Sequence, residues 1–479
     1  MNLEIVLHVL GRLSALLGWL LLVPVAACLG SGGLGSPTGV ALLVTAGLAL
    51  GGGWALRIAC DWDPARFGPG EAFASFGAGW VLFATLGALP YLLTGTLPVP
   101  LDALFESLSG FTTTGATLFV DPAVLPPPLL LWRALTSWIG GFGFVAVSVA
   151  VLPALGAGGN FLYGAELPGR SGERLLPRLS TTVRWLWILY AGFTLAVFAG
   201  LVGAGLSTWM ALCQSLALVS TGGFVTSAAG LSTAPAAVQW VASVAMLVAG
   251  LNFAFLLVAA RGRVATAGRN SELRLYLLGF AALVAVFLWA GGTTSSAGLR
   301  GAILAAASSV STTGLPLPAD TWRVPILPVA VLLFAALGAC SGSPGGGLKI
   351  ARAALLAKGA FREVARLLRP ASVLVLKVDG KPLPERVLAA TGAILVAAML
   401  VTAGGAVALA FMGLDQASAT ASAMAAAANL GGGAAAPGSS TSWADLPALG
   451  KLVVMALMLL GRLEFFSVLV LFSRHAWRR

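Results

Sequence analysis

The chain has 479 residues, of which 58% are hydrophobic and only 9% are charged. A soluble chain carries about 25% charged residues, so this composition excludes an ordinary soluble protein and indicates one embedded in a membrane. The net charge of +11 does not indicate nucleic-acid binding, because the sequence has no stripe of basic residues with interleaved aromatic residues.

Cysteine and histidine usage argues against zinc, redox and haem chemistry. The four cysteines include no CxxC pair, so neither a disulfide framework nor a zinc site is predicted. The two histidines, His8 and His475, lie near opposite ends of the chain, which excludes a bis-histidine haem in the membrane and argues against a histidine general base. We therefore expect no bound cofactor and no enzymatic activity.

The chain begins with two apolar stretches and a polar link. Residues 3–29 and 38–58 are long enough to cross a bilayer, which takes about 20 helical residues. The first stretch is predicted to be a retained helix, because it carries Glu4 and no clear small-residue cleavage site. Residues 1–71 are thus expected to form an N-terminal transmembrane helix pair with its link.

After this pair, one pattern occurs four times: a long apolar stretch, a short one, a polar segment and another long apolar stretch. We expect the four units at residues 72–183, 184–271, 272–385 and 386–479. The first to fourth polar segments are Phe111–Thr117 (FTTTGAT), Ser220–Thr226 (STGGFVT), Ser311–Pro316 (STTGLP) and Asn429–Gly433 (NLGGG).

The short stretches before the polar segments cannot span a bilayer. They cover residues 102–110, 208–219, 298–310 and 415–428. Non-helical backbone at membrane depth survives only inside protein or beside water, so each stretch is predicted to be a re-entrant pore helix. The predicted fold is an all-α integral membrane protein, with four helix–pore-helix–filter–helix repeats around one pseudo-fourfold pore plus the N-terminal helical pair.

The polar segments offer carbonyls and hydroxyls to a dehydrated cation, as ion selectivity filters do. The simpler alternative is a set of helix-capping loops, but four similar segments that each follow a short helix favour a filter. All four aligned glycines are expected to take backbone conformations closed to other residues, which aims carbonyls at the axis. The expected ion-binding residues are Thr113, Thr114, Gly115, Thr221, Gly222, Gly223, Thr312, Thr313, Gly314, Asn429, Leu430 and Gly431.

Basic residues lie between the units and at the C-terminus. They are Arg170, Arg174, Arg178, Arg184, Arg261, Arg263, Arg269, Arg274, Lys358, Arg362, Arg366, Arg369, Lys377, Lys381, Arg386, Arg474, Arg478 and Arg479. The positive-inside rule assigns these loops to the cytoplasm and opens the polar segments to the outside. Glu106 and Asp102 are interpreted as acids near the outer mouth that raise the local cation concentration, with helix-end stabilisation an equal alternative for Asp102.

A glycine-rich segment, Gly338–Lys349 (GACSGSPGGGLK), interrupts an apolar stretch of the third unit. Glycine and proline break helices, so the segment is either a passive kink or a flexible gate beneath the filter. The expected gate residues are Gly342, Ser343, Gly345, Gly346, Gly347 and Lys349, of which the lysine adds a positive charge near the cavity.

Arg462 and Glu464 lie within an apolar run of the fourth unit. A charged residue inside a spanning segment is costly and faces protein or water. Arg462 is either a structural partner of helix-end carbonyls or a positive barrier at the gate. Glu464 lies on another helix face and is expected to be structural, paired with a basic residue of a neighbouring helix.

Four stretches, in chain order, carry a resemblance to a known family. They are FESLSGFTTTGAT (Phe105–Thr117), WRALTSWIGGFGF (Trp132–Phe144), SGSPGGGLK (Ser341–Lys349) and GRLEFFSVLVLF (Gly461–Phe472). Together they resemble the Trk/Ktr/HKT superfamily of potassium transporters, most closely the bacterial TrkH type, and the N-terminal helix pair favours that type over the shorter KtrB type. One departure is Gly432, which stands where the family usually carries a proline.

The resemblance implies potassium uptake across the bacterial inner membrane by a multi-pass protein, with the glycine-rich segment as gate. A potassium symporter coupled to protons or sodium is the alternative, although the sequence offers few buried acids for a proton relay. The resemblance also implies a homodimer in the lipid bilayer on a cytosolic nucleotide-binding regulatory subunit of the TrkA type. No GxGxxG or P-loop in a strand context occurs here, so that subunit is expected to be another chain, contacting residues 170–184 and 358–386.

Overall fold

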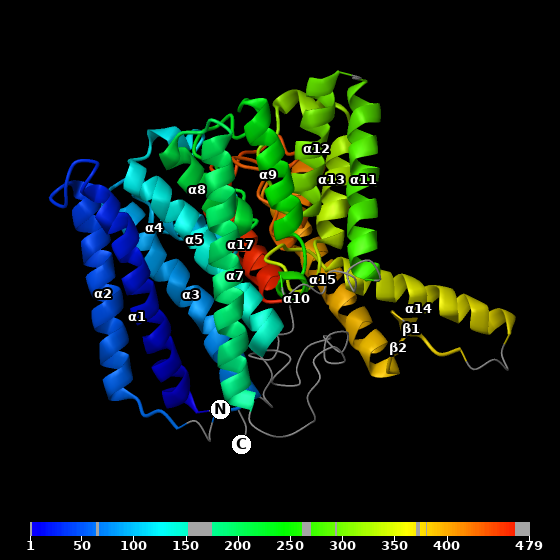
Figure 1. Cartoon of the computed structure of the whole chain (residues 1–479), viewed down its shortest axis with the longest axis horizontal. Helices are drawn as coiled ribbons and strands as arrows, with labels where there is room; N and C mark the ends of the chain where they lie inside the picture. The colour runs from blue at the N-terminus through cyan, green and yellow to red at the C-terminus, as the bar shows by residue number, and fades with distance from the viewer. Residues whose placement is uncertain are drawn as a thin grey trace.

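The computed structural model describes residues 2–63, 67–151, 175–260, 270–292, 295–369, 374–379 and 381–464. Within these ranges the chain is almost wholly helical (Figure 1). In the described part of the chain, seven helices are long and apolar enough to cross a membrane, or eight if one sharply bent pair counts as a span. The predicted all-α membrane fold is thereby confirmed.

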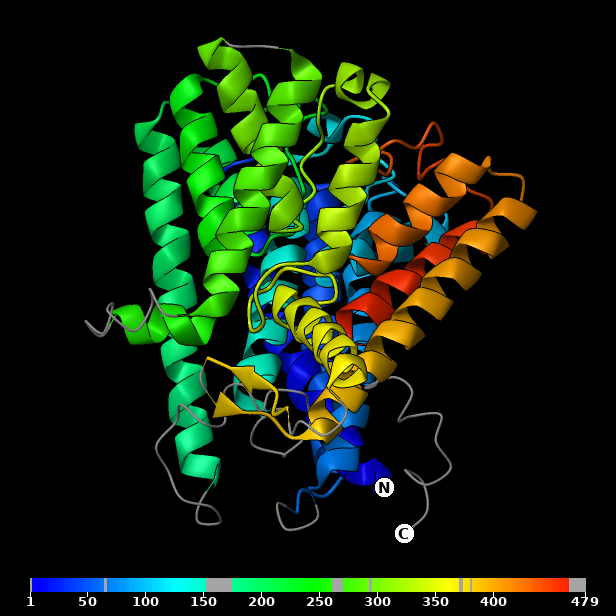
Figure 2. The same ribbon diagram turned by 90° about the vertical axis from the view of Figure 1, so that its right-hand side faces the viewer.

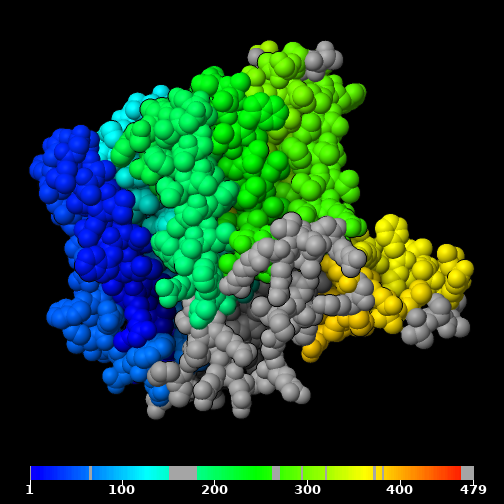
Figure 3. Space-filling model, viewed as in Figure 1, coloured from blue at the N-terminus to red at the C-terminus, as the bar shows by residue number. Residues whose placement is uncertain are grey.

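The N-terminal pair lies at one edge of the molecule, in dark blue in Figures 1 and 3. It comprises α1 (Leu3–Cys28) and α2 (Pro37–Ala59). Gly53 lets the two backbones touch, since a Cβ there would lie 2.6 Å from the carbonyl oxygen of Gly11. Small residues at such contacts are typical of helices packed in membranes.

The first unit comprises α3 (Pro69–Leu93), α4 (Pro100–Phe111) and α5 (Pro127–Ala146). Each helix starts with a proline, whose missing N–H falls where a helix has no acceptor for it. The π-helical turn η3 (Val147–Val151) continues α5, and the 3-10 turn η2 (Pro122–Val124) follows the first polar segment.

The second unit comprises α7 (Leu175–Gly203), α8 (Thr208–Val219) and a broken last helix. The break separates α9 (Ala236–Ala249) from α10 (Phe253–Ala260) with a bend of 102°. The sequence analysis did not anticipate this bend, and it also began the unit at Arg184, inside α7.

The third unit comprises α11 (Ser271–Gly291), α12 (Ser296–Val310) and α13 (Ile326–Leu337), with the 3-10 turn η6 (Ala319–Arg323) after the third polar segment. The glycine-rich segment then forms a loop part-way up the bundle (Figure 2).

Beyond the glycine-rich segment, amphipathic helix α14 (Ile350–Leu368) leaves the bundle sideways (Figures 1 and 3). The strands β1 (Lys377–Val378) and β2 (Lys381–Pro382) follow it and pair antiparallel, with Val378 opposite Lys381.

The fourth unit comprises α15 (Glu385–Phe411), α16 (Gln416–Ala427) and α17 (Ala448–Arg462). The basic residues expected at positions 170, 174, 261, 263, 269, 474, 478 and 479 lie outside the described residues.

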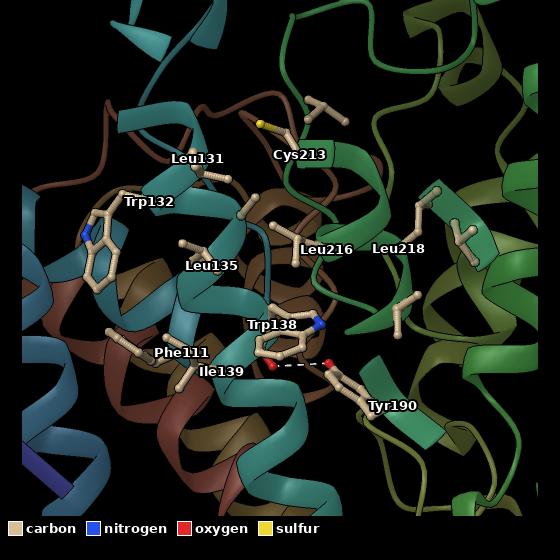
Figure 4. Packing of buried hydrophobic residues seen from close by; sticks show 14 of the residues in the cluster. Phe111, Leu131, Trp132, Leu135, Trp138, Ile139, Tyr190, Cys213, Leu216 and Leu218 are labelled. Carbon is tan, nitrogen blue, oxygen red and sulfur yellow. Dashed lines mark hydrogen bonds between the residues drawn. The ribbon is translucent and has the colours of Figure 1, made fainter. Parts of the chain in front are cut away.

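The four units close into a ring. The last long helix of each unit packs on the short helix of the next: α5 on α8, α9 on α12, α13 on α16, and α17 back on α4. Aromatic and aliphatic side chains fill the contact between the first two units (Figure 4), where the Tyr190 hydroxyl donates to the carbonyl of Trp138 at 3.1 Å. This closure carries the ends of all four short helices to one axis.

Candidate functional site: four polar segments around one axis

The four polar segments leave their short helices in the same way. The residue two places after each helix has a left-handed backbone, with φ of 53°, 52°, 57° and 52° at Thr113, Thr221, Thr312 and Asn429. Such a φ is a genuine outlier for a β-branched residue, yet three of the four are threonines. Repeated strain at equivalent places is characteristic of functional sites.

The N–H of the following residue bonds back into the short helix. It reaches the carbonyl five residues earlier, as in a Schellman cap. The four bonds are Thr114 to Ser109 at 2.9 Å, Gly222 to Ala217 at 2.8 Å, Thr313 to Ser308 at 2.9 Å, and Leu430 to Ala425 at 2.8 Å. The segments are therefore capping loops in their hydrogen bonding, and this use of their donors leaves their carbonyls for another partner.

The segments touch one another in cyclic order. A Cβ on Gly115 would lie 2.3 Å from Gly222 O, one on Gly223 2.0 Å from Thr313 O, and one on Gly314 2.8 Å from Gly431 N. A Cβ on Gly431 would lie 2.5 Å from Thr114 O, which closes the ring. All twelve residues expected to bind ions are buried and lie in these four contacting stretches.

The fourth segment departs from the other three. Gly115, Gly223 and Gly314 have φ of 77°, 67° and 70°, whereas Gly431 does not have a positive φ and Gly432 does, at 70°. The expectation of a left-handed backbone at all four aligned glycines is therefore wrong for Gly431. The reason is a neighbouring loop that folds back, so that the Trp443 indole donates to Gly431 O at 3.3 Å.

The side chains of the left-handed residues differ in their hydrogen bonds. Among the described residues, Thr113 Oγ1 and Asn429 Oδ1 are buried without a hydrogen-bond partner. The hydroxyl of Thr312 instead accepts the Gly346 N–H at 2.6 Å. The glycine-rich segment thus contacts the ring directly at Thr312.

The glycine-rich segment lies against the third and fourth polar segments. A Cβ on Gly345 would lie 2.8 Å from Ser311 O, and one on Gly346 2.0 Å from Ala428 O. The main chain of the same segment also bonds to the α9–α10 break: Cys340 N donates to Gly250 O at 3.0 Å, and the N–H of Phe253 donates to Gly342 O at 3.2 Å.

Two buried cations hold the glycine-rich segment. Lys349 Nζ donates to the carbonyls of Ser343 and Gly345. The Arg462 guanidinium donates to Pro344 O at 2.5 Å and to Gly140 O of α5 at 3.0 Å, and its centre lies 4.3 Å from the Phe144 ring. Arg462 therefore makes the carbonyl bonds of the structural alternative while touching the segment expected to be the gate.

Glu464 forms an ion pair with Arg352 of α14 at 2.5 Å. The sequence-based expectation of a structural pair with a neighbouring helix is confirmed for this residue.

The first short helix carries an ion pair that the sequence analysis missed. Glu106 is fully buried and lies 2.8 Å from Arg133 of α5, so its interpretation as an acid at the outer mouth is wrong. Asp102 lies in the first turn of α4, as its helix-end alternative expected, and also pairs with Lys451 of α17 at 2.7 Å. The available signal was Arg133 itself, a lone charge within an apolar helix.

A cavity of 280 Å³ adjoins the ring on the side of the residues that follow the polar segments. All four units line it, through residues such as Thr117, Val225, Pro316 and Gly433, together with the side chains of Phe119 and Trp322. The ring thus lies between an open cavity and the glycine-rich segment.

A family described as TrkH, a cation transport protein, matches residues 66–292 and 298–478 of this chain. The chain belongs to the TrkH family. A Trk system potassium uptake protein TrkH of Halomonas elongata is 33% identical to it over the whole length of both chains. Its counterpart in Salmonella typhimurium is 34% identical and covers 85% of this chain and 86% of its own.

The crystal structure of the potassium transporter TrkH from Vibrio parahaemolyticus superimposes with a TM-score of 0.88, at 29% identity and with full coverage of both chains. Membership of the TrkH family confirms the resemblance found in the sequence and the order of helices described above. It also identifies the chain as a membrane transport protein rather than an enzyme.

Proposed function

We propose that this chain takes up potassium across the bacterial inner membrane through the axis of the four polar segments. The observation that carries the proposal is their closed ring, in which N–H groups bond back to the short helices and the carbonyls, apart from that of Gly431, are left over. Relatives named potassium uptake proteins over the full length of the chain support potassium as the ion.

In this proposal a potassium ion exchanges its water shell for oxygens of the ring. The twelve ring residues from Thr113–Gly115, Thr221–Gly223, Thr312–Gly314 and Asn429–Gly431 supply these oxygens. The unpartnered Thr113 Oγ1 adds a ligand at the end of the ring nearest the glycine-rich segment. The membrane potential favours entry by about 2.3 kcal/mol per charge for each 100 mV.

The glycine-rich segment is the proposed gate. Gly342, Ser343, Gly345, Gly346 and Gly347 lie where an ion leaving the ring would pass, and Lys349 and Arg462 place positive charge beside them. Opening then requires this segment to leave Thr312 Oγ1 and the bases of the third and fourth segments.

Partners follow from the names of the relatives, which belong to a Trk system. We propose a homodimer that a cytosolic regulatory subunit of the TrkA type controls through residues 170–184 and 358–386. Helix α14 supports the second of these contacts, because it projects from the bundle with Phe361, Leu367 and Leu368 exposed. Of the first contact, residues 170–174 lie outside the described residues, and 175–184 form the start of α7.

Channel-like passage fits the buried acids better than coupled symport. Near the ring and the glycine-rich segment, the buried Glu106 and the half-buried Glu464 are ion-paired with Arg133 and Arg352, and the buried Glu272 accepts the Ser341 N–H. A guanidinium bonded to a carboxylate occupies an oxygen through which a proton relay would have to run.

The test is a reversal-potential measurement on the purified protein in planar bilayers or liposomes. Under mixed potassium and sodium, the reversal potential should follow the potassium gradient and ignore an imposed pH gradient. A reversal potential that moves with the proton or sodium gradient would establish coupled transport instead. No potassium-dependent current or flux at any potential would remove the proposal.

A further inference from the structure

The buried pair of Glu106 and Arg133 is bonded almost entirely to residues that follow the ring. Both carboxylate oxygens of Glu106 are used in this way: Oε1 accepts from Thr117 Oγ1 at 2.9 Å, and Oε2 accepts from the Leu118 N–H at 2.9 Å. Thr117 and Leu118 lie directly after the first polar segment's glycine and alanine. Glu106 of the short helix α4 thus fixes the residues that lead out of the first polar segment.

Arg133 extends this network to the second unit. Its Nε donates to Glu106 at 2.8 Å, one terminal nitrogen donates to Thr117 Oγ1 at 3.0 Å, and the other donates to Val225 O at 3.1 Å. Its guanidinium centre also lies 4.0 Å from the Phe224 ring. Because Phe224 and Val225 follow Gly223, one side chain ties together the residues that leave the first and second segments.

The network reaches the fourth segment as well. Thr117 donates its backbone N–H to Gly433 O at 3.1 Å. Its hydroxyl meanwhile donates to Glu106 and accepts from Arg133. Through these bonds Thr117 links the first, second and fourth polar segments.

The other units do not repeat this arrangement. Seven residues before the left-handed position, where the first unit has Glu106, the others carry Gln214, Ala305 and Ser422. Gln214 reaches Thr226 Oγ1 only at 3.4 Å, and its Oε1 has no partner among the described residues. Among the described residues, the charged bracing of the segments' outgoing ends thus comes from the Glu106–Arg133 pair.

We propose that Glu106 and Arg133 are positioning residues for ion selectivity: they set the spacing of the outgoing ends of the first, second and fourth segments without touching the ion. The inference rests on the proposed function. Charge-assisted hydrogen bonds are roughly twice as strong as neutral ones, and a planar guanidinium holds several acceptors in fixed geometry. Ring oxygens held at fixed spacing discriminate between ions of different radius, whereas loosened ones adapt to both.

The test compares two double variants that each remove one buried or half-buried ion pair from α4. Glu106→Gln with Arg133→Gln removes the brace and leaves no unpaired buried charge, which is the costly state. Asp102→Asn with Lys451→Gln removes the pair between α4 and α17, which makes no bond to a residue that follows the ring. The measurements are the potassium-to-sodium permeability ratio and the Tm of each purified protein.

We expect the brace variant to lower the permeability ratio by about tenfold, which corresponds to about 1.4 kcal/mol of lost discrimination. The Asp102–Lys451 variant should lower Tm and leave the ratio within about twofold of the wild type, a difference of about 0.4 kcal/mol. An equal fall in both variants, or a folded brace variant with the wild-type ratio, overturns the proposal.

Thr117→Val decides the question should the brace variant fail to fold. It keeps both charges, their pairing and the Leu118 N–H bond to Glu106, and it removes the Thr117 hydroxyl that bonds to both charged side chains. The ratio should fall here too, and an unchanged ratio overturns the proposal. A wild-type protein that shows no preference for potassium would instead contradict the proposed function, which separates the two failures.

Discussion

The first and fourth polar segments begin alike and end differently. Thr113 and Asn429 share a left-handed backbone, and the next N–H of each bonds to a carbonyl of its short helix. Two residues later they diverge. Gly115 is left-handed and Ser109 Oγ donates to Ala116 O at 2.6 Å, whereas Gly431 is not left-handed and its carbonyl accepts from an indole.

The difference shows that different residues determine the inner and outer halves of a polar segment. The shared inner half is set by the helix end, whose cap needs only main-chain atoms. The outer half is set by whichever side chains stand behind it: an ion pair for the first segment and Trp443 for the fourth. The ring is consequently closest to fourfold symmetry at its inner end.

The largest expected effect comes from disrupting the close contact between two neighbouring polar segments. Gly115→Ala places a Cβ 2.3 Å from Gly222 O at a φ of 77°. Overlap and strain together amount to about 3 kcal/mol, so potassium flux in liposomes should fall about a hundredfold.

The control for this change is Gly413→Ala, which has a φ of 99° but open space around the new Cβ. It should lower Tm slightly and keep the flux. If the Gly115→Ala variant conducts like the control, the close packing of neighbouring polar segments does not matter for transport.

A smaller effect is expected at the proposed gate. The glycine-rich segment touches the fourth polar segment, and Arg462 ties it to α5, which follows the first. Arg462→Ala removes the bonds to Pro344 O and Gly140 O together with the positive charge. An ion 6 Å from that charge meets a repulsion of about 3 kcal/mol at an effective dielectric of about 20, and water reduces it. Flux should therefore rise about tenfold.

Arg462→Lys keeps the charge and should keep most of the barrier. Flux and Tm are measured on the same purified variants. A well-folded Arg462→Ala protein with wild-type flux would rule out the barrier and leave Arg462 a structural residue.

Trp443→Phe sharpens the comparison further, because it releases the carbonyl of Gly431 while keeping an aromatic ring in the core. A lost neutral hydrogen bond is worth about 1 kcal/mol, so the permeability ratio should change by about fivefold. The matched change Trp80→Phe removes an indole bond of 3.1 Å to Phe111 O, which precedes the ring. Equal changes in the permeability ratio for both variants would show that the Gly431 carbonyl has no special role in selectivity.

The smallest expected effect concerns the caps of the short helices. Asp415 caps α16, and hydrogen bonds from Ser418 lower the pKa of its carboxyl, whereas α4 has no side-chain cap. The stabilisation is present above the ordinary carboxyl pKa of about 3.9 and is lost as the pH falls through the lowered value. Between pH 5 and about pH 3, the wild-type Tm should fall slightly more than that of Asp415→Asn, whose amide caps without titrating. Parallel curves for both proteins would contradict this.

Sequence alone predicted the order of elements because each depends on local pattern. The short helix α8 begins and ends where the apolar stretch does, at Thr208 and Val219. The alignment of Thr113, Thr221, Thr312 and Asn429 followed from the same repetition, and the structure places all four in one backbone conformation.

The remaining features depend on partners far along the chain. Whether Glu106 faces water or Arg133 is decided by how α4 packs on α5, which no local pattern encodes. The bend at Gly250–Asn252 is stabilised by bonds to the glycine-rich segment some 90 residues later, as between Gly250 and Cys340. Gly431 is held by Trp443, and the spacing between them gives no sign of the fold-back.

Main-chain hydrogen bonds make up most of the contacts that hold the glycine-rich segment. Besides its bonds to Gly250 and Phe253, Leu348 N donates to Ala336 O at 2.9 Å and Ile350 N donates to Ala339 O at 3.2 Å. Inserting or deleting a single residue would shift all of these bonds out of register, so the length of the segment is constrained. The residue type is constrained as well where a Cβ would meet a neighbouring carbonyl oxygen, at 2.8 Å for Gly345 and 2.0 Å for Gly346.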